Sequence, residues 1–197
     1  MEAYTLIAFL GSSILLTLTP GPDLLFVMHQ SLTRGWRSGF GVALGLCSGL
    51  VIHTFLVAWG LGSVLEQNPH FFWGIKVFGA LYFLILAIKI WNNRHDKTPL
   101  KEPLNGGWGK GLIMNLSNPK VLLFFLGFMP QFLFYPRWST PVQLSVLGVL
   151  FVGQALVVFF IVAQLSDRFR KRVTTPFNRP GLQTGLYGAF VLWILFS

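Results

Sequence analysis

Two charged residues, Asp23 and Lys120, lie inside apolar stretches of the sequence, and each directly follows a proline. A charged side chain costs about 2.5 to 3.5 kcal/mol at the centre of a membrane helix, so each should face the protein interior and have a partner. One interpretation is a structural ion pair that neutralises both groups. The other is a binding site, because a carboxylate and an ammonium group together complement a zwitterionic amino acid. The pattern alone leaves both open.

The prolines beside these charges should open the helices that contain them. Asp23 ends the segment Thr19-Pro20-Gly21-Pro22-Asp23, and Lys120 ends the segment Asn115-Leu116-Ser117-Asn118-Pro119-Lys120. Opened backbone is tolerated in a bilayer only where protein or a watery cavity satisfies its polar groups. Paired, proline-interrupted helices in corresponding places of two halves are typical of a transporter's binding site. The predicted substrate-binding residues are Pro20, Gly21, Pro22, Asp23, Asn115, Asn118, Pro119 and Lys120.

The elements that position these residues are expected to be membrane spans. Of the 197 residues, 53% are hydrophobic and only 11% are charged, whereas a soluble domain carries about 25% charged residues. The mean hydropathy is +0.63. A bilayer core about 30 Å thick requires about 20 apolar helical residues. Six segments have this length or nearly so: residues 4–28, 39–65, 71–91, 111–134, 142–165 and 182–196.

Lysines and arginines are distributed very unevenly over the connections between these spans. Twelve lie in the connections after the first, third and fifth spans, against Arg137 on the opposite side. Cytoplasmic loops hold the excess of basic residues, so both termini are predicted to lie outside the cytoplasm. The net charge of +9 is thereby interpreted as a topology signal. A nucleic-acid partner is not expected, because it would need a basic face on a soluble fold.

We therefore expect an all-α membrane protein with six transmembrane helices, arranged as two inverted three-helix repeats with broken first helices. The first repeat covers residues 1–91, a cytoplasmic linker covers residues 92–110, and the second repeat covers residues 111–197. Because three is odd, two such halves lie in opposite orientations in the membrane. The start of the chain lacks the basic leader of a secretory signal, so the first apolar stretch is interpreted as a permanent span.

The second predicted span carries two further features. Gly41, Gly45 and Gly49 form a small-residue stripe at four-residue spacing, which allows the close approach of another helix. That helix is the first span, the fourth span or a second protomer, so a homo-oligomer stays open. His53 lies near the middle of the same span. It either relays protons, with Asp23 as the second group, or is held by a structural hydrogen bond.

The sequence predicts no cofactor and no metal site. Cys47 is the only cysteine, which excludes a paired-thiol redox centre and a cysteine metal cluster. A membrane-embedded enzyme is not expected, because no intramembrane spacing of a nucleophile and a base stands out. The alternative function is a divalent metal-ion exporter of similar six-span design. Such a protein should show clustered carboxylates, thiols or histidines in its spans, yet Asp23 and His53 are the only obvious candidates in the sequence.

Several motifs are shared with one transporter family. They are the first broken segment, the glycines of the second span followed by Val51-Ile52-His53, the run Gly111 to Lys120, and Phe128-Met129-Pro130-Gln131-Phe132. With these motifs, the region from about residue 19 to residue 132 resembles the LysE/RhtB family of amino-acid exporters. The resemblance implies a secondary transporter of the bacterial cytoplasmic (inner) membrane that expels amino acids or close derivatives. It also implies drive by the proton gradient or by exchange. The expected partners are a small-molecule amino-acid substrate and the lipid bilayer.

Overall fold

The computed structural model describes residues 2–61, 73–74, 77, 81 and 106–172. Every regular element within these ranges is a helix, in agreement with the predicted all-α class. The predicted span over 182–196 lies outside the described residues, and so do nearly all of the span over 71–91 and most of the linker over 92–110.

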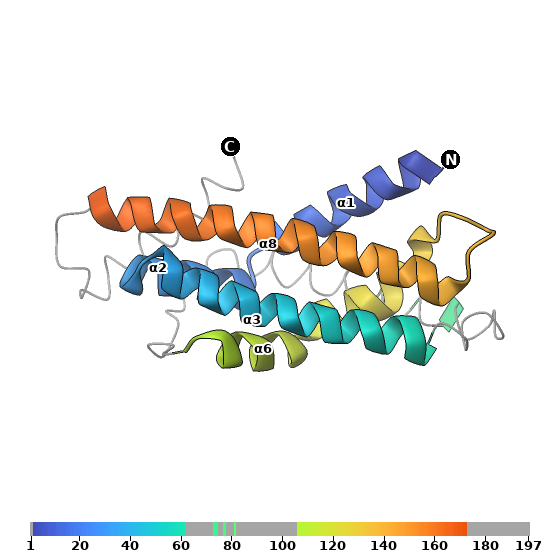
Figure 1. The fold of residues 1–197 in the computed structure, drawn as a ribbon, viewed down its shortest axis with the longest axis horizontal. Helices are drawn as coiled ribbons and strands as arrows, with labels where there is room; N and C mark the ends of the chain where they lie inside the picture. Colours follow the sequence, from blue (N-terminus) through green and yellow to red (C-terminus); the bar gives the residue numbers. More distant parts are fainter. Residues whose placement is uncertain (1, 62–72, 75–76, 78–80, 82–105, 173–197) are drawn as a thin grey trace.

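Two long helices form the axis of the molecule. One is α3, Trp36–Phe55, which the π-helical segment η1, Leu56–Leu61, continues, and the other is α8, Thr140–Arg172. Both are long and apolar enough to cross a membrane, and each contains an 18-residue stretch of high mean hydropathy, 2.0 in the first and 2.7 in the second. They lie side by side along the long axis (Figure 1). Because apolar residues occupy nearly all sides of each helix, both suit a surrounding of lipid and other helices.

The first predicted span is a pair of helices joined at a sharp bend. Helix α1, Glu2–Leu18, ends just before Pro20, and α2, Pro22–Arg34, begins with the second proline. The two helices meet at 58° and together have the length and hydropathy of a membrane span. The predicted break is therefore confirmed, and its cause is local, since proline cannot continue the hydrogen-bond ladder.

The fourth predicted span is broken in a similar way. Helix α6, Trp108–Leu116, is followed by α7, Pro119–Leu123, which continues through η3, Phe124–Phe128, and η4, Met129–Phe132. The two parts meet at 53°, and together they also have the length and hydropathy of one membrane span. The described residues thus contain two unbroken spans, or four when each bent pair counts as one. The two bent pairs run in opposite directions along the long axis (Figure 1).

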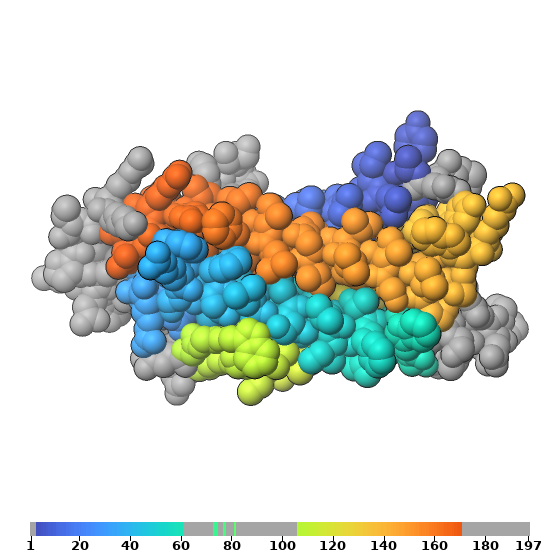
Figure 2. Space-filling view, in the orientation of Figure 1, coloured from blue at the N-terminus to red at the C-terminus, as the bar shows by residue number. Residues whose placement is uncertain are grey.

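Glycines set the close approach of α3 to α6. A Cβ atom built onto Gly45 would collide with the backbone of Trp108, and one built onto Gly49 would collide with the side chain of Asn115. From the other side, Gly111 of α6 lies against the backbone of Val42. At Gly45 and Gly49, the helix that packs on the small-residue stripe is therefore the fourth predicted span. A Cβ atom built onto Gly41 would have no other atom within 4 Å. Figure 2 shows α8, α3 and α6 next to one another on one face.

Aromatic side chains fill the space between α1, η3 and α8. The rings of Phe124 and Phe151 lie 5.0 Å apart, and Phe125 lies 5.4 Å from Phe151. Phe9 joins this cluster from α1, 6.2 Å from Phe124. All four side chains are buried, so α1 of the first bent pair and η3 of the second are held against α8 by aromatic packing.

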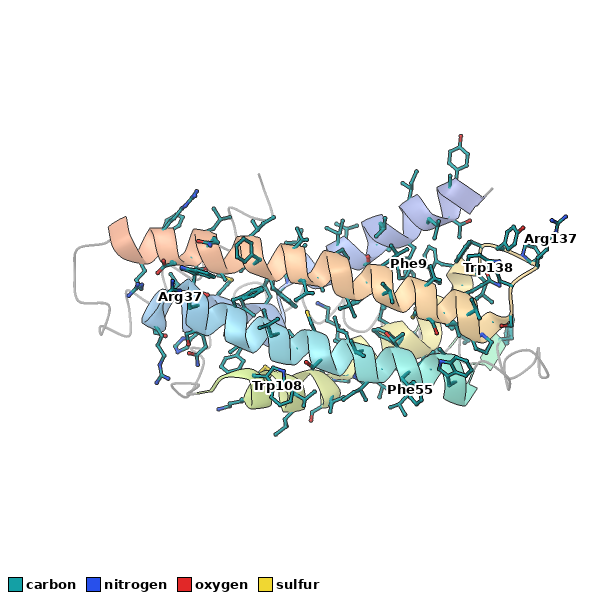
Figure 3. All side chains as sticks on the ribbon, viewed as in Figure 1. Phe9, Arg37, Phe55, Trp108, Arg137 and Trp138 are labelled. Carbon is teal, nitrogen blue, oxygen red and sulfur yellow. The ribbon has the colours of Figure 1, made fainter. Side chains whose placement is uncertain are left out.

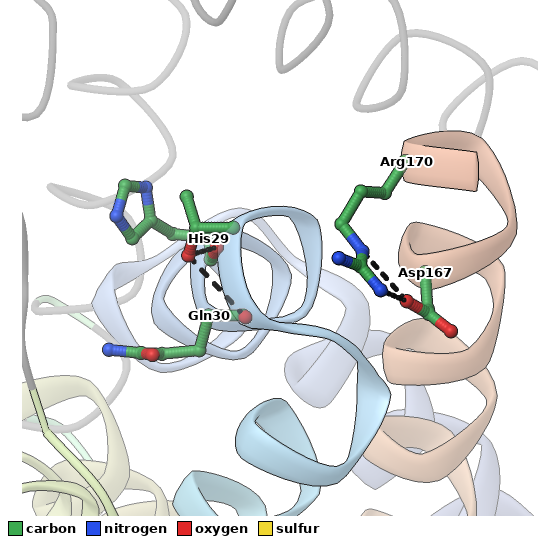
Figure 4. Close-up of polar contacts among 5 residues, drawn as sticks. His29, Gln30, Asp167 and Arg170 are labelled. Atoms are coloured by element: carbon green, nitrogen blue, oxygen red, sulfur yellow. Dashed lines mark hydrogen bonds and ion pairs between the residues drawn. The ribbon is translucent and has the colours of Figure 1, made fainter. Parts of the chain in front are cut away.

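The two ends of the long axis carry different basic residues. Arg37 lies at one end, and Arg137 and Trp138 lie at the other (Figure 3). At the end with Arg37, Gly35 makes the turn between α2 and α3 with a φ of 90°, which favours glycine because other residues are strained there. Asp167 of α8 is buried near this turn and pairs with Arg170 at 2.9 Å (Figure 4).

Candidate functional site

The first break leaves backbone carbonyls at the end of α1 without their usual donors. In an unbroken helix the N–H of residue 20 would reach the carbonyl of Leu16, but Pro20 has no N–H. The last regular bond of α1 runs from the Thr19 N–H to the Leu15 carbonyl at 2.8 Å. On the far side of the break, Gly21 is extended and Pro22 begins α2. Asp23 thus lies in the first turn of α2, where the helix dipole favours a negative charge.

The second break has the same order of a cap, a proline and a charged residue. Asn118 caps α7, and its Oδ1 accepts a hydrogen bond from the Lys120 N–H at 3.0 Å. Pro119 occupies the first helical position and Lys120 the second, as Pro22 and Asp23 do in α2. The charges at the two breaks are opposite in sign, although the backbone arrangement is alike.

Lys120 crosses from the second break to the first. Its Nζ donates to the Leu16 carbonyl at 2.5 Å and to the Thr19 carbonyl at 3.0 Å. The lysine therefore supplies the donor that Pro20 withholds from Leu16. Its charge also suits the carbonyl end of α1, where the helix dipole is negative.

Asp23 crosses in the other direction, from the first break to the second. Its Oδ2 accepts a hydrogen bond from Asn115 Nδ2 at 3.1 Å. The other oxygen of each group, Asp23 Oδ1 and Asn115 Oδ1, is buried and has no hydrogen-bond partner. Within the described part of the chain, the ion pair that forms is Arg170–Asp167. Asp23 and Lys120 both belong to that part, and they form no direct ion pair with each other. Each of the two charged side chains thus forms hydrogen bonds with residues at the opposite break, and the two form no ion pair with each other.

A small cavity lies where the two breaks meet. Its volume is about 30 Å³, and it is lined by residues of α1, the two breaks, α3 and α8. Five of the eight predicted substrate residues line it, whereas the three prolines do not. The residues that line the cavity are Leu16, Thr17, Thr19, Gly21, Asp23, Leu24, Leu50, Asn115, Asn118, Lys120, Val121, Phe151, Ala155 and Phe159.

His53 is buried on α3 but does not line the cavity. Its Nε2 lies 3.5 Å from the backbone carbonyl of Asn115, and its ring lies 5.6 Å from that of Phe125. Since Asn115 also holds Asp23, the two predicted relay residues are connected through one asparagine. Among the described residues, no group of three or more histidine, cysteine or acidic side chains comes together as a metal site would require.

Sequence reasoning missed the contribution of α8 to this region. Gln154 donates from Nε2 to Thr17 Oγ1 at 3.0 Å and to the Ser13 carbonyl at 3.4 Å. Its own Oε1 is buried without a hydrogen-bond partner. The signal was available, because Gln154 is a polar residue in the middle of an apolar run. The apolar lining residues Phe151, Ala155 and Phe159 carry no comparable signal.

Comparisons with known proteins agree with these observations. Residues 14–194 match the family model described as LysE type translocator. A homoserine/homoserine lactone efflux protein of Salmonella typhimurium is 30% identical over 189 residues, which cover 94% of this chain and 91% of the relative. An uncharacterised membrane protein of Vibrio cholerae is 29% identical over 180 residues, covering 89% of this chain and 87% of that protein. No solved structure matches the chain.

Proposed function

Because this chain belongs to the family of LysE type translocators, we propose that it is a secondary active transporter that exports amino acids or close derivatives across the bacterial cytoplasmic membrane. The observation that carries this proposal is the meeting of two broken helices around one cavity, with a carboxylate, two amides and an ammonium group in its wall. Broken helices that meet in this way supply both charges and free backbone groups to a ligand.

The Salmonella relative, named for efflux of homoserine and homoserine lactone, supports a small amine as cargo. Homoserine and its lactone share an ammonium group, and the lactone lacks a free carboxylate. The substrate site would consist of the two breaks, namely Pro20, Gly21, Pro22 and Asp23 with Asn115, Asn118, Pro119 and Lys120. The prolines would open the helices and so free backbone groups, and the polar side chains would contact the substrate.

The whole chain would form six spans in two inverted repeats, residues 1–91 and 111–197, with the linker over 92–110 in the cytoplasm. The opposite directions of the two bent pairs support this arrangement (Figure 1). Both termini would lie outside the cytoplasm, which puts the end with Arg37 inside and the end with Arg137 outside.

Export would be coupled to the proton gradient through Asp23, with His53 as the second relay group. Both residues contact Asn115, Asp23 through the side-chain amide and His53 through the backbone carbonyl, which places the two residues near each other. A carboxylate cannot hold a proton and an ammonium group at the same time. Competition for Asp23 would therefore exchange one for the other, as proton-driven export requires.

An efflux assay tests the proposed function. Cells that express the protein are loaded with labelled amino acids, and release is followed with and without an intact proton gradient. Release of at least one amino acid should be faster than in control cells and should slow when the gradient is collapsed. Expression that expels a divalent metal, with no enhanced amino-acid efflux over the whole panel, would instead establish the metal-exporter alternative. Ser48→Ala, which removes an exposed hydrogen bond to Trp108 outside the cavity, serves as the matched control variant.

A further inference from the structure

We propose that α1 swings about the first break to open the cavity toward the outside of the cell, and that Gln154 of α8 is a positioning residue that holds α1 in its closed place. In the proposed orientation α1 forms the outer half of the first span, which is why its movement opens the cavity outward. This inference rests on the proposed function and adds how the same site becomes accessible.

In the arrangement of the structure, the cavity is too small for the proposed cargo. A volume of about 30 Å³ holds roughly two or three water molecules, since each needs about 10 to 15 Å³ of such space. Even a small amino acid has more non-hydrogen atoms than that. The arrangement is therefore a closed one, and a wall of the cavity must move before a substrate can enter.

The helices α2, α3, α6 and α8 are locked together by contacts at glycines. A Cβ atom built onto Gly39 of α3 would collide with Ser31 of α2, and one built onto Gly148 of α8 would collide with Thr54 of α3. The contact of α3 with α6, described above, is of the same kind. Packing this close leaves the helices little freedom to separate. These four helices are therefore interpreted as one unit that stays together when the cavity opens.

Helix α1 is attached to this unit in a different way. Its own glycine, Gly11, would have no other atom within 4 Å of a Cβ, and the helix diverges from α8 toward its N-terminal end (Figure 1). The ring of Phe9 holds it to Phe151 at 6.5 Å, which is a contact between side chains and not between backbones. At its other end, the extended Gly21 lies in the 58° bend. Residues at the ends of elements commonly act as hinges, so α1 combines a hinge with a side-chain attachment.

Gln154 fixes the last turn of α1 against α8. Its Nε2 donates to Thr17 Oγ1 at 3.0 Å and to the Ser13 carbonyl at 3.4 Å. Thr17 lines the cavity, and so does Ala155, the residue that follows Gln154. Hydrogen bonds between membrane helices are individually weak, and Gln154 Oε1 has no partner in this arrangement. Gln154 thus sets the closed position of α1 through a contact weak enough to be released in each transport cycle.

The same movement changes what Lys120 contacts. Its Nζ donates to the carbonyls of Leu16 and Thr19, and both residues lie on the α1 side of Pro20. When α1 swings away, it withdraws these carbonyls, and the ammonium group becomes free for the carboxylate of a substrate. A substrate that binds Lys120 in the open arrangement therefore shifts the equilibrium toward that arrangement.

Thiol labelling measures the opening of the cavity without any substrate. Cys47, the only cysteine, is replaced by alanine, and Ala155→Cys then places one thiol in the cavity wall. A thiol reagent that does not cross membranes is added to right-side-out or inside-out vesicles that contain the full-length protein. Gln154→Leu should raise the labelling rate from the outside by about threefold or more, in line with the free energy of one such bond. Thr17→Val, which removes the acceptor, should raise the rate as well, whereas Ser48→Ala, which removes a hydrogen bond between α3 and α6, should leave it unchanged.

Linking α1 to α8 should stop transport. Thr17→Cys/Gln154→Cys without Cys47 is treated with a short, reducible reagent that joins two thiols, and amino-acid exchange should cease on linking and return on reduction. Linking α3 to α6 through Ser48→Cys/Trp108→Cys should leave exchange unchanged. The inference is wrong if Gln154→Leu and Thr17→Val leave the labelling rate unchanged, if they raise it only from the cytoplasmic side, or if the linked α1 still supports exchange. Because labelling needs no substrate, the expected labelling without any amino-acid exchange would count against the proposed function and not against the movement of α1.

Discussion

Lys120, in the second broken helix, donates a hydrogen bond from Nζ to the backbone carbonyl of Leu16, in the first. That carbonyl is the one that Pro20 leaves without a helical donor. The contact completes one break with a side chain from the other, so the two interruptions form one structural unit. Asp23 and Asn115 make the reciprocal contact.

A cycle of variants should reveal this capping role. Lys120→Met strands the Leu16 carbonyl and is expected to cost about 1 to 3 kcal/mol of stability. Pro20→Ala restores an N–H at the position that reaches Leu16, so it should recover folded protein in the Lys120→Met background. Membrane abundance and thermal unfolding in detergent are the measurements. Pro22→Ala is the matched control, since its N–H would reach Leu18, and an equal rescue by this variant would rule the capping role out.

Asp23 and Lys120 should not compensate for each other. Because no direct ion pair joins them, the double variant Asp23→Asn/Lys120→Met should be no more active than either single variant. Asp23→Asn alone should abolish efflux while leaving membrane abundance nearly intact, because Asn115 Nδ2 can still donate to the remaining carbonyl oxygen. Efflux and abundance are measured in the three variants. Recovery of transport in the double variant would show that the two charges merely neutralise each other.

The close contact of α3 with α6 predicts different effects for two neighbouring glycines. Gly45→Ala would push a methyl group into the backbone of Trp108, and overpacking of this kind costs about 1 to 3 kcal/mol. Gly41→Ala meets no atom within 4 Å and should change stability by less than about 0.5 kcal/mol. Thermal unfolding of the two variants compares them directly. Equal destabilisation would mean that Gly41 has a partner beyond the described residues.

Reporter fusions test the proposed orientation. A reporter that is active only outside the cytoplasm should work when fused at Ser197 or near Asn68, and it should fail near Thr98 or Thr174. The expectation follows from the excess of lysine and arginine on one side of the membrane. A fusion at Ser197 that reports a cytoplasmic location would overturn both the orientation and the count of six spans.

The sequence was sufficient to locate both breaks, because proline acts on its own helix and needs no distant partner. It could not identify what each charge contacts, since that depends on how segments about a hundred residues apart come together. The two charges were expected either to pair or to bind a ligand. They form no ion pair with each other, and binding of a ligand stays a prediction. Lys120 contacts two main-chain carbonyls, and the N–H that is missing at Pro20 could have suggested this partner. The apolar wall from α8 has no local signature, because Phe151 and Phe159 resemble any other residues of a membrane span.

The distance along the chain between Leu16 and Lys120 has a consequence for biogenesis. The two partners are 104 residues apart, and ribosomes add about 5 to 20 residues per second. For roughly 5 to 20 s after α1 has been synthesised, the Leu16 carbonyl therefore lacks its donor, because Lys120 has not yet been added to the chain. During that interval we expect the nascent first half to depend on water, lipid headgroups or the insertion machinery to satisfy its open carbonyls. Chains stopped just before residue 120 should accordingly be degraded faster than chains stopped shortly after α7, a difference that pulse-chase labelling would measure.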